Sequence, residues 1–113
     1  MMRIDKPWGY EIIWAHTDKY VGKILHINSG HSLSRQLHRI KEETLYVSAG
    51  SLLLEIGSAE EMIVHRLSPG DAFHVPPGLI HRMRAPEGEV ELVEVSTPEL
   101  DDVVRLEDFY GRS

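Results

Sequence analysis

Residues 30–43 read GHSLSRQLHRIKEE, and Gln36, His38 and Glu43 in this stretch are of the kinds that bind metal ions. Gln36 and His38 are two positions apart, so on a β-strand both side chains leave the same face. Glu43 follows five residues later, at the start of the next apolar run, which leaves room for a bend that returns its carboxylate toward the same point. An amide, an imidazole and a carboxylate in this order predict an open metal site carried by two successive strands.

Residues 70–81 read GDAFHVPPGLIH and form the second informative stretch. The Pro76-Pro77-Gly78 sequence predicts a tight, rigid turn, because proline fixes φ and glycine accepts positive φ. His81 comes just beyond this turn, where a ligand from a distant strand could enter the same cavity. The two stretches together predict a four-ligand site made of Gln36, His38, Glu43 and His81.

Short apolar runs that end at turn signals recur along the chain at spacings of roughly ten residues, which is typical of a β-sandwich or closed barrel. Residues 100–110 begin with acidic residues and stop at Gly111, which indicates at most one short helix or a turn there. The expected strands cover residues 21–27, 44–47, 52–56, 62–67, 72–75 and 90–95.

Length and composition narrow the class of protein. A chain of 113 residues with 42% apolar and 27% charged residues predicts one domain over residues 1–113. Cysteine is absent, which excludes disulfides and thiolate ligands and fits a cytoplasmic location. The net charge of −6, with acids and bases interspersed, argues against a nucleic-acid partner but permits a local site for a small anion. No stretch approaches the roughly 20 apolar residues that span a membrane.

Both stretches resemble the motifs of the cupin superfamily. The first motif covers residues 30–50 and has Gln36 where a histidine is more usual, and the second covers residues 70–85 and has Ala85 where asparagine is frequent. The resemblance implies an all-β, single-domain cupin, a double-stranded β-helix or jelly-roll barrel that binds one divalent metal. The matching motif positions are Gly30, Gln36, His38, Glu43, Gly50, Gly70, Pro76, Gly78 and His81.

A narrower resemblance covers almost the whole chain. It is similar to the mannose-6-phosphate isomerase domain of the type II bifunctional isomerase and mannose-1-phosphate guanylyltransferase proteins, in segments such as KPWG at 6–9, SLSRQLH at 32–38 and PPGLIHR at 76–82. A Gln–His–Glu–His set holds zinc in phosphomannose isomerases, so the resemblance implies zinc, with manganese, iron or nickel as alternatives. Lys41 and Leu45 depart from this family, which usually has arginine and a bulky aromatic residue there.

Several charged residues are expected to line the cavity. Lys23 alternates with Leu25 and Ile27, so its side chain would point into the barrel, where a cation needs a partner. Each of these residues also has a plainer alternative. Lys23 could lie at a strand end and reach water, His74 could be a half-buried strand residue, and Arg112 could pair with nearby acids. The candidate bases are Lys23, His74 and Glu94, and the candidate substrate-binding residues are Lys23, Lys41 and Arg112.

Three functions follow from these expectations. The first is aldose–ketose isomerisation of a sugar phosphate through an enediolate, with mannose 6-phosphate as the reference substrate. The second is a module that binds a sugar or anion through the same metal without turnover. The third is an iron-dependent oxygenase, which the amide of Gln36 disfavours. The resemblance also implies a small-molecule partner and a homodimer.

Overall fold

The structure is a computed structural model that describes residues 2–112. Over this range the regular elements are all strands, which confirms the all-β prediction, and no helix is long and apolar enough to cross a membrane. The strands are β1 (Met2–Lys6), β2 (Gly9–His16), β3 (Val21–Ile27), β4 (Arg35–Leu37), β5 (Glu43–Ala49), β6 (Leu52–Gly57), β7 (Met62–Leu67), β8 (Ala72–Val75), β9 (His81–Arg84), β10 (Val90–Ser96) and β11 (Val104–Glu107).

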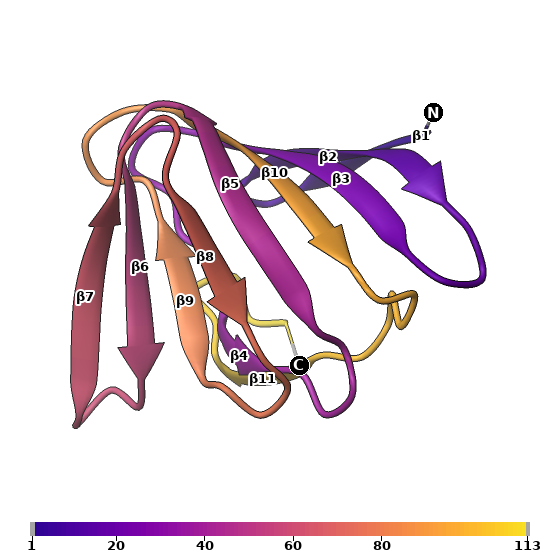
Figure 1. The fold of residues 1–113 in the computed structure, drawn as a ribbon. Coiled ribbons are helices and arrows are strands. Elements are labelled where there is room, and N and C mark those ends of the chain that lie inside the picture. Colours follow the sequence, from indigo (N-terminus) through magenta and orange to yellow (C-terminus); the bar gives the residue numbers. More distant parts are fainter. Residues whose placement is uncertain (1, 113) are drawn as a thin grey trace.

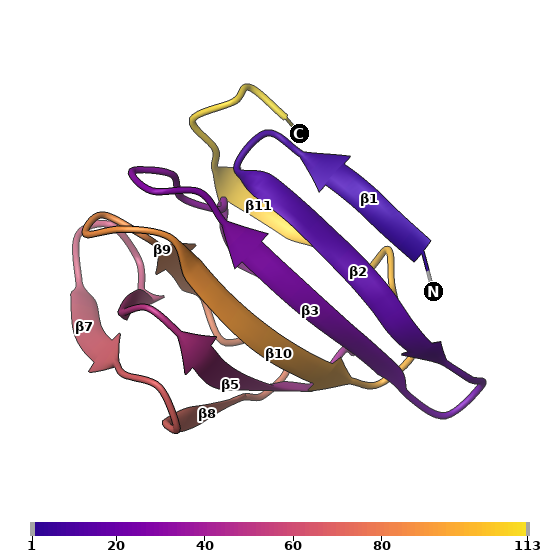
Figure 2. The same ribbon diagram turned by 90° about the horizontal axis from the view of Figure 1, so that it is seen from above.

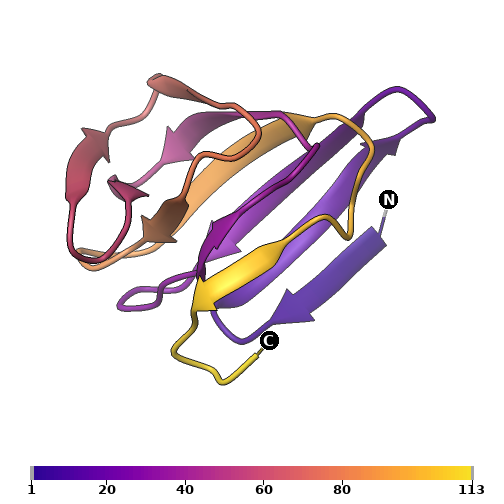
Figure 3. The same ribbon diagram turned by 90° about the horizontal axis from the view of Figure 1, so that it is seen from below.

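The strands form two antiparallel sheets that make the two layers of a barrel (Figure 1). The six-stranded sheet has the order β1-β2-β3-β10-β5-β8, and its long strands lie side by side in Figure 2. The five-stranded sheet has the order β11-β4-β9-β6-β7. Seen from below, β11 lies in front of β2 and β3 (Figure 3), and it belongs to the five-stranded sheet, opposite these strands.

The interior of the six-stranded sheet changes from apolar to polar along its strands. Leu92 on β10 lies opposite Leu25 on β3 and Val47 on β5, and all three are buried in the core. Two residues further along β10, Glu94 lies opposite Lys23 on β3 and is also buried. Because alternate residues of a strand share one face, the apolar and ionic side chains line the same barrel at different depths.

The segment considered for a short helix forms a strand instead. Val104 and Arg105 of β11 pair with Leu37 and Gln36 of β4. Pairing with β4 satisfies the backbone groups of this segment, whereas an isolated helix of about ten residues would be marginal. The adjacent Val103 and Val104 also favour a strand.

An ionic network is buried on the outer face of the five-stranded sheet. Glu55 on β6 is 2% exposed and accepts hydrogen bonds from Arg35 Nη2 at 2.7 Å, Arg82 Nε at 3.2 Å and Arg84 Nη1 at 3.0 Å. The ring of Phe109 lies 4.6 Å from the Arg82 guanidinium carbon and helps to cover it. The network therefore joins β4, β6 and β9, and through Arg82 it contacts Phe109 in the segment after β11.

Candidate metal centre and adjoining cavity

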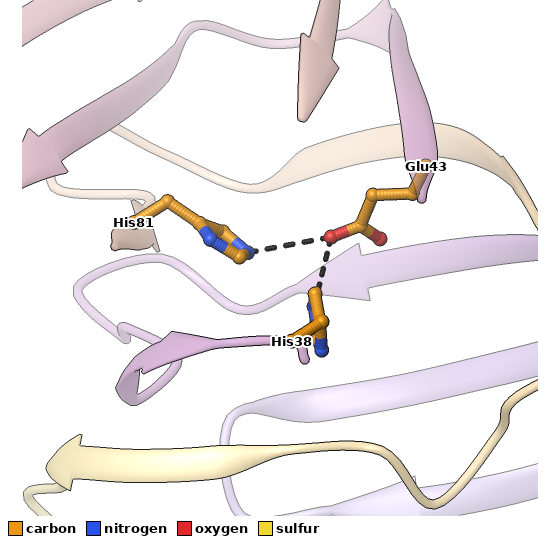
Figure 4. Close-up of side chains that lie close together, drawn as sticks. All are labelled: His38, Glu43 and His81. Carbon is orange, nitrogen blue, oxygen red and sulfur yellow. Dashed lines mark hydrogen bonds and ion pairs between the residues drawn. The ribbon is translucent and has the colours of Figure 1, made fainter. Parts of the chain in front are cut away.

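Three side chains from distant parts of the chain meet inside the barrel. His38 follows β4 and His81 begins β9 on one sheet, whereas Glu43 begins β5 on the other. All three are buried, and their ligand-type atoms lie within 4.8 Å of one another. Figure 4 shows both imidazoles directed at the carboxylate, with Glu43 Oε1 3.0 Å from His38 Nε2 and 3.3 Å from His81 Nε2.

The second ring nitrogen of each histidine defines which nitrogen faces the cluster. His38 Nδ1 lies 2.5 Å from the main-chain oxygen of Asp102, and His81 Nδ1 lies 2.9 Å from that of Leu79. Because a carbonyl oxygen can only accept a hydrogen bond, each Nδ1 carries the hydrogen. Each ring therefore directs Nε2 at Glu43, and Nε2 is the nitrogen that would bind a cation, as in metal-binding histidines.

The cluster suits a divalent cation because of its donor set. Two imidazole Nε2 atoms and one carboxylate converge, and this arrangement is favourable only when protons or a metal ion lie among them. Among the described residues, the buried atoms Glu43 Oε2 and His81 Nε2 have no hydrogen-bond partner. Two nitrogen ligands and a carboxylate are a ligand set that zinc accepts in open sites.

Gln36 lies next to this cluster. It pairs in register with His81 across β4 and β9, and its Oε1 accepts a hydrogen bond of 2.7 Å from the hydroxyl of Ser34. An amide oxygen has two lone pairs, so one remains for another contact. Gln36 and His38 both line the adjoining cavity.

The cavity measures about 270 Å³ and has an ionic wall. Its polar side comes from both sheets and from the segments around β11, and its apolar side includes Trp8, which is buried in the core cluster. The charged residues that line it are Lys6, Glu11, Lys23, Lys41, Glu94, Asp101, Arg105 and Arg112.

Ion pairs link the deep wall of the cavity to the metal cluster. Lys23 Nζ lies 3.4 Å from Glu11, and Lys41 Nζ lies 3.2 Å from Glu94 and 3.7 Å from Glu43. All five side chains are buried. Each of these buried ionisable groups therefore has a partner nearby, which offsets the cost of removing it from water.

Burial and mutual repulsion separate the pKa values of the Glu43 and Glu94 carboxyl groups. Burial raises the pKa of Glu94 to about 8, and the charge of Glu43 adds to the effect. Burial also opposes ionisation of Glu43, but the neighbouring imidazole nitrogens of His38 and His81 and the charge of Lys41 outweigh it and hold the pKa of Glu43 well below its usual value. A cation at Glu43 would cancel part of the charge that keeps Glu94 protonated.

The structure places four of the five sequence-derived cavity residues in the wall. Lys23, Lys41, Glu94 and Arg112 line the cavity, and Arg112 donates to Asp108 at 3.0 and 3.1 Å.

His74 does not face the cavity, which corrects its assignment as a candidate base. It lies on β8, where Val75 is buried and the neighbouring position 74 points outward. Its side chain is 56% exposed and hydrogen-bonds Glu42 at 2.5 Å on the surface.

Sequence reasoning missed two residues that shape the site. Glu11 alternates with Ile13 on β2, so recognising this strand would have placed Glu11 on the inner face beside Lys23. Asp102 accepts hydrogen bonds from the main-chain amides of residues 39–41, and these bonds lower its pKa to about 2. No local pattern marks Asp102, because its partners lie about sixty positions away.

Curated relatives match almost the whole length of this chain. The chain is 30% identical to the xanthan biosynthesis protein XanB of Xanthomonas campestris pv. campestris over 98% of its own length and 24% of that protein. It is 34% identical to the mannose-1-phosphate guanylyltransferase ManC of Salmonella typhimurium over 96% of its length and 23% of that protein. The chain thus spans about a quarter of the length of these relatives.

Solved structures and a family model agree on the fold. KdgF from Halomonas sp. superposes with a TM-score of 0.76 at 26% identity, covering 89% of this chain and 91% of that one. The capsular polysaccharide assembling protein CapF from Staphylococcus aureus superposes with a TM-score of 0.81 at 16% identity, covering 94% of this chain and 34% of that one. A family model described as a cupin domain matches residues 23–96. The chain therefore belongs to the cupin family.

Proposed function

We propose that this cupin is a metal-dependent isomerase that interconverts the aldose and ketose forms of a sugar phosphate, with mannose 6-phosphate and fructose 6-phosphate as the reference pair. The observation that carries the proposal is the convergence of two imidazole Nε2 atoms and one carboxylate, from His38, His81 and Glu43, beside a cavity of about 270 Å³. Relatives named for the guanylylation of mannose 1-phosphate support a sugar phosphate as the class of substrate.

His38, Glu43 and His81 would hold the cation, and Gln36 would add an amide oxygen from the cavity side. We favour zinc, because two imidazoles and a carboxylate are common zinc ligands. When bound, a divalent cation supplies positive charge that stabilises negative charge developing on the substrate oxygens.

We assign the proton transfer to Glu94. Isomerisation moves one proton from the carbon beside the aldehyde to the aldehyde carbon, and another from the hydroxyl of that neighbouring carbon to the aldehyde oxygen. The base that accepts the carbon-bound proton must return it. Glu94 lines the cavity, and Lys41 donates a hydrogen bond of 3.2 Å to it. A cation at Glu43 would lower the raised pKa of Glu94 and favour the carboxylate form that accepts a proton. Lys23 is an ammonium paired with Glu11, so we assign it to binding substrate hydroxyls.

We assign the phosphate group to Arg112. Its side chain is 24% exposed, against 6% for Lys41, so it lies nearer the solvent side of the wall. A planar guanidinium can donate two parallel hydrogen bonds to phosphate. Lys41 is held between Glu94 and Glu43 and would act through these carboxylates.

A binding protein without turnover is the second candidate. The observation that favours it is the pairing of cavity cations with acids, since Lys23, Lys41 and Arg112 each contact a carboxylate. Such pairs offer donors and acceptors to a polyhydroxylated ligand and need not supply a base.

The experiment loads the protein with zinc, manganese, iron or nickel and measures fructose 6-phosphate formed from mannose 6-phosphate. We expect His81→Ala to lose both metal binding and turnover, and the matched variant His74→Ala to keep both, because His74 lies on the outer surface. Turnover by His81→Ala would refute the mechanism. Metal binding without product for all four ions would favour the binding protein.

A further inference from the structure

His38 is not fixed by strand pairing. It follows the three-residue strand β4, and its main-chain oxygen accepts a hydrogen bond of 2.7 Å from the amide of Gly78. On the side of its ring away from Glu43, Nδ1 donates a hydrogen bond to the main-chain oxygen of Asp102 at 2.5 Å. The position of that oxygen therefore decides where His38 Nε2 points.

The side chain of Asp102 ties this oxygen to the segment that follows His38. Asp102 Oδ1 accepts from the amide of Arg39 at 3.1 Å, and Oδ2 accepts from the amides of Ile40 and Lys41 at 2.7 and 2.9 Å. One residue thus holds the His38 ring through its main chain and the three following amides through its side chain. These four hydrogen bonds connect Asp102 to the ring of His38 and to the backbone of the three residues that follow it.

The same segment also reaches the cavity wall. Leu100, Asp101 and Val103, which flank Asp102, line the cavity. Thr97 anchors the start of the segment, since its amide donates to the main-chain oxygen of Glu42 at 3.0 Å and its hydroxyl accepts from the Glu42 amide at 3.0 Å. Asp102 therefore lies between the wall of the cavity and the metal cluster.

We infer that Asp102 is a positioning residue for His38, holding the ring in the Nδ1–H form with Nε2 directed at the cation. The inference rests on the proposed metal centre, but the part that concerns the ring can be measured without metal. A histidine ligand needs a partner on its second nitrogen to keep its tautomer and orientation, and loss of such a partner typically weakens metal affinity by about 10–100-fold.

The test compares wild type with Asp102→Ala and Asp102→Asn as full-length proteins. Zinc affinity is measured by competition with a chromophoric chelator, and the tautomer of His38 is read from its ring ¹⁵N chemical shifts in metal-free protein. We expect Asp102→Ala to weaken zinc binding by about 10–100-fold and to mix the two tautomers. Asp102→Asn keeps one acceptor oxygen, so its loss should be smaller.

Asp71→Ala is the matched control, because Asp71 also accepts a main-chain hydrogen bond, from Ser68 at 2.8 Å, in a turn that does not line the cavity. It should lower thermal stability and leave zinc affinity and the His38 tautomer unchanged. Wild-type zinc affinity and an unmixed tautomer in both Asp102 variants would overturn the inference. If wild type binds no zinc, the proposed function fails, and the tautomer measurement still decides whether Asp102 orients His38.

Discussion

Replacing Glu55 with glutamine should destabilise the protein more than any exposed charge substitution. Glu55 is 2% exposed and accepts from three arginines, of which Arg35 and Arg82 are themselves 4% and 6% exposed. Removing one partner of a buried ion pair costs about 3–5 kcal/mol. Glu107, 2.8 Å from Arg82 Nη1 and 3.6 Å from Arg35 Nε, still offsets part of the arginine charge, so the cost should lie toward the lower end of this range. For a chain of this size that range corresponds to a fall in Tm of roughly 12–20 °C.

The cost should depend on pH in a defined direction. Burial opposes ionisation of Glu55, but hydrogen bonds from Arg84 and Arg35 outweigh it and lower its pKa below the ordinary value of 4.5. A carboxyl group with a lowered pKa stabilises the fold above its unfolded-state pKa, and the contribution is lost as the pH falls through the folded-state pKa. The difference between wild type and Glu55→Gln should therefore be full at pH 7 and shrink below about pH 4.5.

Urea unfolding followed by circular dichroism at pH 7 and at stepwise lower pH measures this difference. Glu87→Gln is the matched control, because Glu87 makes a bidentate pair with Arg66 at 2.8 and 2.7 Å but both side chains are about half exposed. Water and salt screen such a pair, so the control should cost far less. Equal costs for the two variants, or a cost for Glu55→Gln that persists at low pH, would refute the reasoning.

Two further substitutions test backbone and core. Gly50→Ala should destabilise more than Gly30→Ala: both glycines have φ near +82°, which costs an alanine about 1–2 kcal/mol, but only the Gly50 Cβ would meet a backbone atom, Glu89 O at 2.2 Å. Equal urea midpoints for the two variants would contradict this. Leu54→Ala should cost about 2–5 kcal/mol because Leu54 is fully buried, whereas Leu106→Ala, at a position 51% exposed, should lie within about 0.5 kcal/mol of wild type by the same measurement.

Most of the barrel could be predicted from apolar runs bounded by glycine and proline. The expected strands at 21–27, 62–67 and 72–75 have the same bounds as β3, β7 and β8. β2 was missed because Glu11 occupies an inward position and breaks the alternation that marks a strand. β11 was missed because its pairing with β4 lies far away in sequence. Strands β3 and β10 are predictable although they carry Lys23 and Glu94 into the cavity, because apolar residues occupy most of their other positions.

The candidate site was predictable in part, where the spacing of residues along a single strand shows which side chains share a face. Spacing on one strand identified Gln36 and His38, and alternation with Leu25 indicated an inward Lys23. The partner of each buried charge could not be read in this way, because Glu11 and Asp102 meet their partners only across the fold. The homodimer and the cytoplasmic location stay predictions from the sequence.

The division of the cluster between two sheets bears on how the protein folds. Glu43 belongs to the six-stranded sheet, whereas His38 and His81 are carried by the five-stranded one. Neither sheet alone contains the set, so the three donors meet only when the two layers have closed on each other. Affinity for a cation would appear late in folding, after the long-range strand pairings have formed. A cation bound there would join the two sheets, because its ligands come from both of them. Cation release would then be coupled to separation of the sheets, and chelation should speed the first opening of the barrel.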